Sequence, residues 1–114
     1  MLKKIAIPTA GGSLCLHFGH CEQFMVFDVD VENKEILGES FLTPPPHEPG
    51  VLPRFMKEKN INVILAGGMG SRAQDFFKEF GIEVIVGAQA ADLKQIVNDY
   101  LTGNLKVGIN GCSH

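Results

Sequence analysis

The stretch that decides the fold is NVILAGGMGSRAQDFFKEFGIEVIVG, residues 62–87. Asn62–Ala66 is nearly all apolar, as expected of a strand that is covered on both faces of a sheet. A glycine-rich turn follows, and Ser71–Phe80 has the apolar spacing of a helix with one buried side. Gly81 is a typical helix stop, and Glu83–Val86 predicts another strand. This order predicts two parallel strands joined by a right-handed crossover.

Before this stretch, three segments have the composition of strands: Lys3–Pro8, Glu22–Val31 and Glu35–Leu42. Asn33-Lys34 is a plausible hairpin turn between the second and the third. Because the connections are short, we expect an antiparallel meander. The consecutive prolines make Thr43–Gly50 a rigid, extended loop.

Two more helices are predicted at Val51–Lys59 and Ala88–Leu101, the second closed by Gly103. The chain is therefore expected to form one α/β domain over residues 1–114, with a mixed five-stranded sheet and helices on its faces. The order strand–strand–strand–helix–strand–helix–strand–helix matches the ribonuclease-H-like architecture. Lys3–Pro8 has no acid, so the metal-dependent nuclease chemistry of that architecture is not expected. The residues expected on the buried sides of the three helices are Leu52, Phe55, Met56, Ala73, Phe76, Phe77, Phe80, Ala91, Leu93, Ile96, Val97 and Leu101.

The composition is that of a globular protein: 114 residues, 45% hydrophobic and 20% charged. Three cysteines cannot all pair within one chain, which favours a reducing compartment. The start lacks the features of a signal peptide, and no apolar run is long enough to span a bilayer. We therefore expect a soluble, cytoplasmic protein. A net charge of -3 with scattered basic residues argues against binding to nucleic acid or membrane.

Ligands of such sheets usually bind beyond the carboxyl ends of the parallel strands. Three loops are expected there, Thr9–His20, Ala66–Ser71 and Gly87–Gln89, and the loop Pro44–Gly50 could reach the same rim. Residues that carry chemistry are therefore expected in these loops.

Metal-ligating residues gather in the first loop and just after it, with the spacing C-x-H-x-x-H-C for Cys15, His17, His20 and Cys21. Imidazole and thiolate bind Zn, Cu and Fe. Alternatively, these side chains only pack or form hydrogen bonds. The spacing differs from that of a closed structural zinc site. His47 lies in PPPHEPG and is either a pre-organised contact residue or incidental to a stiff connector.

The turn Gly67-Gly68-Met69-Gly70 leads from a strand into a helix. Backbone N–H groups at a helix N-terminus favour an anion, with Ser71 as a candidate helix cap and Arg72 as a candidate further charge. Alternatively, the glycines only serve a tight turn that needs positive φ. The turn is not a P-loop, because the G-x-x-x-x-G-K-[ST] pattern is missing.

All four histidines and all three cysteines lie in predicted loops or in the final segment that holds Cys112 and His114. The role of these last two residues is open. Soft ligands beside an anion-binding turn suit a metal–sulfur cluster, or an oxo- or thiometalate anion, better than a bare cation.

The combination of KIAIPT, HFGHCEQF, PPPHEPGVLPRFM, the GGMGSRA turn and GIEV resembles the dinitrogenase iron–molybdenum cofactor biosynthesis family. That family includes the carrier proteins NifX and NafY, the C-terminal domain of NifB, and an orange protein with a molybdenum–copper–sulfide cluster. The resemblance spans roughly Lys3 to Leu101. It implies a ribonuclease-H-like fold and a non-catalytic protein that binds or carries a metal–sulfur cluster (Fe/Mo or Mo/Cu sulfide) or its precursor. Partners would be the proteins that donate or accept this cluster.

The family's H-F-G pattern falls on His17-Phe18-Gly19, its G-G-x-G turn on Gly67–Gly70, and its H-x-P-G element on His47–Gly50. We thus expect cofactor contacts from these segments and from His20, and metal ligation by a smaller set. The cofactor-contact set is His17, Phe18, Gly19, His20, His47, Gly67, Gly68, Met69 and Gly70; the metal-ligating set is His17, His20, Cys21 and His47.

Two other functions remain open from the residues alone. One is a phosphate-ester hydrolase that holds phosphate at the glycine turn and uses a histidine as acid or base. Against this function, the sequence has no cluster of acidic residues and no obvious nucleophile–base pair. The other is a regulatory interaction domain without a small ligand.

Overall fold

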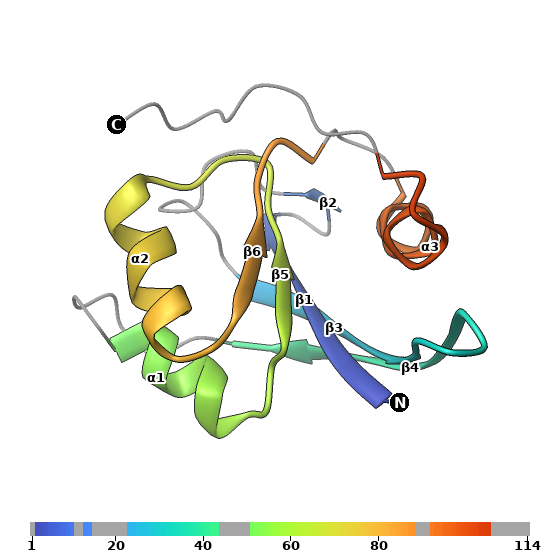
Figure 1. Cartoon of the computed structure of the whole chain (residues 1–114), viewed down its shortest axis with the longest axis horizontal. Helices are drawn as coiled ribbons and strands as arrows, with labels where there is room; N and C mark the ends of the chain where they lie inside the picture. The colour runs from blue at the N-terminus through green and yellow to red at the C-terminus, as the bar shows by residue number, and fades with distance from the viewer. Residues whose placement is uncertain (1, 11–12, 15–22, 44–50, 89–91, 106–114) are drawn as a thin grey trace.

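The computed structural model describes residues 2–10, 13–14, 23–43, 51–88 and 92–105. The strands and helices alternate in the second half of the chain, as predicted (Figure 1). In chain order the elements are β1 (Leu2–Ala10), β2 (Ser13–Leu14), β3 (Gln23–Asp30), β4 (Glu35–Leu42), α1 (Val51–Glu58), β5 (Val63–Leu65), α2 (Ser71–Glu79), β6 (Glu83–Ile85) and α3 (Leu93–Thr102).

Five strands form a mixed sheet in the order β4-β3-β1-β5-β6. β1 pairs antiparallel with β3, and β3 with β4, whereas β1, β5 and β6 run parallel. The predicted five-stranded sheet and its strand directions are thus confirmed. The structure adds β2, which pairs with Thr9 and Ala10 at the end of β1. Two residues are too few to show a strand pattern, so the sequence predicted only a loop there.

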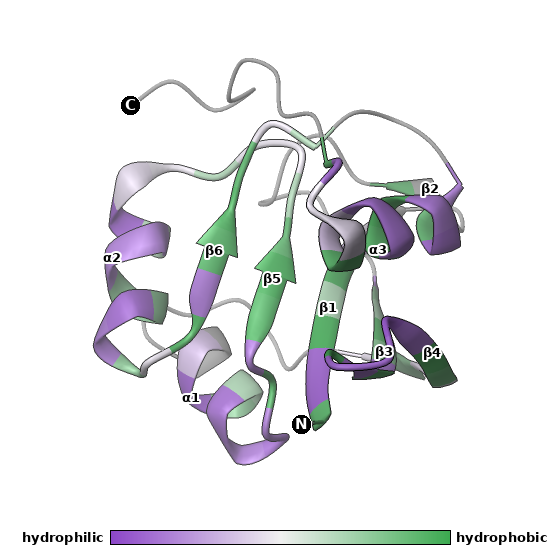
Figure 2. Ribbon diagram, turned by 45° about the vertical axis from the view of Figure 1, so that its right-hand side comes forward, coloured by the Kyte–Doolittle hydropathy of each residue, from purple (hydrophilic) through white to green (hydrophobic). Residues whose placement is uncertain are grey.

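The sheet has a hydrophobic core on each face. Successive residues of a strand point to opposite faces, so Ile5 and Ile7 pack beneath α3 while Ala6 packs on the side of α1 and α2. Figure 2 shows apolar residues along β1, β5 and β6 and polar residues on the outer sides of the helices. The described residues of the α3 core are Ile5, Ile7, Leu14, Phe27, Val29, Val63, Leu65, Ala88, Leu93, Ile96, Val97 and Leu101. Those of the α1 and α2 core are Ala6, Phe24, Val26, Met56, Ile61, Ile64, Ala66, Met69, Phe77 and Ile82.

Most of the predicted helix and strand boundaries agree with the structure, but the predicted start of α3 was wrong. β4 has the predicted bounds, and Gly103 ends α3 in the left-handed conformation at φ 77°. The helix begins at Leu93, not at Ala88. The reason is that the N–H of Ala88 donates to the carbonyl of Ala66 at 3.0 Å, which ties this residue to the end of β5.

The predicted buried sides of the helices are confirmed in part: Phe55, Ala73 and Phe80 are only partly buried and pack against the core of α1 and α2. Met56, Phe77 and the apolar side of α3 from Leu93 onward are buried. Phe76 is only half-buried, and the side chain of Leu52 and all of Ala91 lie outside the described part. In the part of the chain that the structure describes, no helix is both long and apolar enough to cross a bilayer.

Tyr100 on α3 is the single tyrosine of the chain, and its hydroxyl donates to Glu83 Oε1 on β6 at 3.0 Å. Burial, the hydrogen bond and the Glu83 charge together raise the pKa of Tyr100 to about 12. The folded state therefore holds the phenol proton more tightly than the unfolded chain, whose tyrosine pKa is about 10. The stabilisation from Tyr100 is complete below pH 10 and is lost as the pH rises from about 10 to 12.

We expect the phenolate absorbance of the native protein to rise with a midpoint near the pKa of about 12. Since the chain has no tryptophan, an ultraviolet titration reads this group alone. A Glu83→Gln variant should titrate at lower pH because the neighbouring charge is gone. A native midpoint at the value of free tyrosine would contradict the buried, hydrogen-bonded arrangement.

Candidate functional site

Five strand ends meet at one rim of the sheet, which we call the glycine rim. β1, β5 and β6 are parallel, so their carboxyl ends share it (Figure 2). β3 runs the other way and begins at this rim, where Gln23 lies opposite Thr9. β4 ends there, with Leu42 opposite Phe24. The predicted rim is therefore present in the described part of the chain.

Most of the predicted ligands lie outside the described residues. This holds for His17, Phe18, Gly19, His20, Cys21 and His47, and also for Cys15, Cys112 and His114. The described neighbours nevertheless place the attachment points of the two histidine-bearing segments: residues 15–22 lie between Leu14 and Gln23, and residues 44–50 follow Thr43. All three neighbours lie at the glycine rim. Within the described ranges, no group of three or more His, Cys, Asp or Glu side chains gathers.

The glycine turn between β5 and α2 lies at this rim and is tied to the end of β6. The N–H of Ala66 donates to Ile85 O at 2.8 Å, and the N–H of Gly87 donates to Gly67 O at 3.0 Å. Gly87 adopts φ 86°, a left-handed conformation that glycine tolerates best. These bonds fix the backbone of the turn, in which Gly67 and Gly68 are buried and Gly70 is partly exposed.

The start of α2 offers backbone donors that no side chain of the described residues caps. Its N-cap is Gly70, which is extended at φ -64° and ψ 155°. The suggestion that Ser71 caps the helix was wrong, because Ser71 is already the first helical residue. Within the described part of the chain, no group accepts a hydrogen bond from the N–H of Gly70, Ser71, Arg72 or Ala73. Such groups are the usual anion donors at a helix start.

The glycines of this turn do not serve a left-handed backbone. Among the described glycines, positive φ occurs at Gly81, Gly87 and Gly103 and not in the turn. The alternative that the turn needs glycine for positive φ is therefore wrong. A different reason for glycine is close approach of the backbone to another group, since glycine has no Cβ to obstruct it.

Gln74 holds the turn in one orientation. Its Nε2 donates to the carbonyl of Met69 at 2.8 Å, and its own N–H donates to Gly70 O at 3.1 Å. Because the N–H and C=O of a trans peptide point in opposite directions, the Gly70 N–H points away from the Gln74 side chain. The Met69 side chain is fully buried. The main chain of Met69 is buried as well, since the residue as a whole is 0% exposed, so Met69 supports the turn from the core side.

The local charge also favours an anion. The first turn of α2 has no acidic residue, and Arg72 in that turn is exposed. The helix dipole adds a partial positive charge of about half a unit at the same place. The start of α2 thus carries positive charge in a chain whose net charge is -3.

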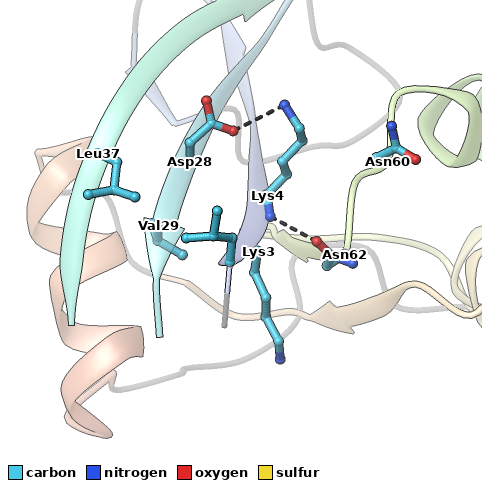
Figure 3. Close-up of a pocket in the computed structure, with 8 residues that line it drawn as sticks. Lys3, Lys4, Asp28, Val29, Leu37, Asn60 and Asn62 are labelled. Atoms are coloured by element: carbon cyan, nitrogen blue, oxygen red, sulfur yellow. Dashed lines mark hydrogen bonds and ion pairs between the residues drawn. The ribbon is translucent and has the colours of Figure 1, made fainter. Parts of the chain in front are cut away.

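A surface pocket of about 470 Å³ lies at the opposite end of β1 (Figure 3). Three of its polar residues contact one another: Lys4 Nζ lies 3.1 Å from Asp28 Oδ1, and the Lys4 N–H donates to Asn62 Oδ1 at 2.9 Å. These groups are exposed and already paired, so the pocket offers a ligand little beyond what water provides. We therefore regard the glycine rim as the candidate site.

Comparisons with known proteins agree with the fold and indicate a family. A model described as dinitrogenase iron-molybdenum cofactor matches residues 1–103. The uncharacterized protein MJ0580 of Methanocaldococcus jannaschii is 30% identical over 109 residues, which are 92% of this chain and 91% of that protein. Among solved structures, PH0822 has a TM-score of 0.84 at 25% identity, covering 95% of this chain and 96% of that one. The apo form of the orange protein from Desulfovibrio gigas has a TM-score of 0.72 at 19% identity and covers 96% of both chains.

Proposed function

Because the chain belongs to the dinitrogenase iron–molybdenum cofactor family, we propose that it binds and carries an anionic metal–sulfur cluster, or a precursor such as a thiomolybdate, without catalysing a reaction. The cluster is cargo, received from a donor protein and passed to an acceptor. The odd number of cysteines favours a reducing compartment, and we place the protein in the cytoplasm. We also assign the strand order to the ribonuclease-H-like class.

One observation carries this proposal: a glycine-lined helix start, which no side chain of the described residues caps, lies on the rim to which both histidine-bearing segments attach. The amides of Gly68 and Gly70 would donate hydrogen bonds to the sulfide or oxide atoms of the cargo. His17, His20, Cys21 and His47 would ligate its metal atoms, since imidazole and thiolate suit iron, molybdenum and copper. Amides and soft ligands together match a species that is both anionic and metallic.

The proposal is tested by isolating the protein without oxygen and measuring its metals, sulfide and visible spectrum. Recombinant protein made without the cognate pathway is then exposed to tetrathiomolybdate. We expect a coloured complex with molybdenum and sulfide in a fixed ratio to protein. A native isolate without metal, together with no uptake from a large excess of tetrathiomolybdate, would contradict the function.

Gln74→Met should weaken tetrathiomolybdate binding by about threefold to tenfold, the range expected for losing one aligned donor. Methionine has a similar length but cannot donate to the Met69 carbonyl, so the Gly70 N–H would lose its fixed direction. Equilibrium titration by visible absorbance measures the effect. Gln95→Met is the matched control, because Gln95 Nε2 donates to Asp99 Oδ1 at 2.8 Å on the exposed side of α3. Equal affinities in the two variants would refute this role of Gln74.

A further inference from the structure

A chain of hydrogen bonds crosses three strands at the glycine rim. Thr9 on β1 is 2% exposed. Among the described residues it is the one polar residue that is buried. Its hydroxyl donates to the carbonyl of Gln23 on β3 at 2.9 Å. Gln23 Nε2 in turn donates to Thr43 Oγ1, just beyond β4, at 3.3 Å. These contacts link residues that are far apart in sequence.

The three residues stand where the histidine-bearing segments attach. Thr9 pairs with Leu14 on one side and with Gln23 on the other, so the two ends of segment 15–22 flank Thr9. Thr43 is the last described residue before segment 44–50. The chain of bonds links the ends at Gln23 and Thr43 to Thr9, and strand pairing holds the end at Leu14 beside Thr9, so three of the four ends of these segments are held relative to each other.

We propose that Thr9, Gln23 and Thr43 form a brace of positioning residues, which sets the spacing of the two histidine-bearing segments before the cargo arrives. The inference rests on the proposed function. Its physical reason is preorganisation: ends that are already held together lose less conformational freedom when groups on both segments bind one ligand. None of the three residues needs to touch the cargo.

The contact between Gln23 and Thr43 separates positioning from folding. Gln23 and Thr43 are exposed, so losing this bond exposes no buried polar group and costs folding little. Its loss should appear in ligand affinity instead. Thr9 is less suited as a probe, because its replacement would leave the Gln23 carbonyl without its buried donor.

The test uses the full chain with tetrathiomolybdate as the probe, and the variants Gln23→Met, Thr43→Val and the double variant. We expect each single variant to bind about three- to fivefold more weakly, as for one neutral hydrogen bond. The double variant should be no weaker than either single one, because both substitutions break the same contact. The melting temperatures should stay close to that of the wild type.

Two matched controls remove the same kinds of group elsewhere. Gln95→Met removes a glutamine donor on α3, and Thr102→Val removes a hydroxyl that donates to Asn98 O at 2.9 Å. Both should bind like the wild type. If the Gln23 and Thr43 variants also bind tetrathiomolybdate like the wild type, the brace is overturned and the proposed function is not. The same holds if the affinity losses of the two single variants multiply in the double variant. No binding by the wild type would overturn the proposed function and this inference with it.

Discussion

Replacing both His17 and His47 with alanine should abolish the uptake of tetrathiomolybdate. The two residues belong to segments that attach at different strands but at the same rim. Under the proposed function each imidazole would supply a ligand to metal atoms that backbone N–H groups cannot ligate, because N–H groups donate hydrogen bonds and offer metal no electron pair. The glycine turn alone would hold only a weakly bound anion. The measurement is visible absorbance and bound molybdenum after anaerobic desalting.

Each single variant, His17→Ala or His47→Ala, should retain partial uptake, since the other imidazole and the amides remain. Circular dichroism and the melting temperature show whether the variants are folded. Gln95→Met serves again as the control that should take up as much molybdenum as the wild type. If a folded double variant takes up as much molybdenum as the wild type, His17 and His47 do not bind the cargo.

The buried side chain of Met69 is expected to contribute strongly to the stability of the fold. Met69→Ala should lower the free energy of unfolding by about 2–5 kcal/mol, the range for truncating a buried methionine or leucine. The Met69 side chain is 0% exposed and packs in the core of α1 and α2. Met69 belongs to the glycine turn and attaches it to this core, so the loss of its side chain affects the site as well as the core. Chemical denaturation followed by circular dichroism measures the change.

Leu37→Ala is the matched control, because Leu37 on β4 is 55% exposed. Its truncation should change the free energy of unfolding by no more than about 0.5 kcal/mol. Met69→Leu should recover most of the stability, since the two side chains have similar volumes. If Met69→Ala were as mild as Leu37→Ala, the turn would not be anchored as described.

The parts of the fold with a strong local pattern could be predicted from the sequence. β4 and the start of α2 agree to the residue, because polar turn residues or glycines mark where their patterns begin. The start of α3 could not be predicted, since the sequence pattern does not show that Ala88 bonds to Ala66. Long-range backbone contacts of this kind override local helix propensity.

The candidate site could be predicted in part. The glycine turn was recognised from its composition, and the rim followed from the strand order. Gln74 and Thr9 were missed as supporting residues, because their role comes from single hydrogen bonds to carbonyls. Neither residue belongs to a motif that would have identified it. The metal-ligating roles of His17, His20, Cys21 and His47 stay predictions.

In the proposed function, backbone amides of the glycine turn and imidazoles from two distant segments bind one anionic cargo. The most direct measurement is an anaerobic titration of ¹⁵N-labelled protein with tetrathiomolybdate, followed by nuclear magnetic resonance. We predict that the Gly68 and Gly70 amides and the His17 and His47 imidazoles shift together and saturate at the same ligand ratio. Shifts confined to the amides or to the imidazoles, or saturation at different ratios, would contradict a single shared site.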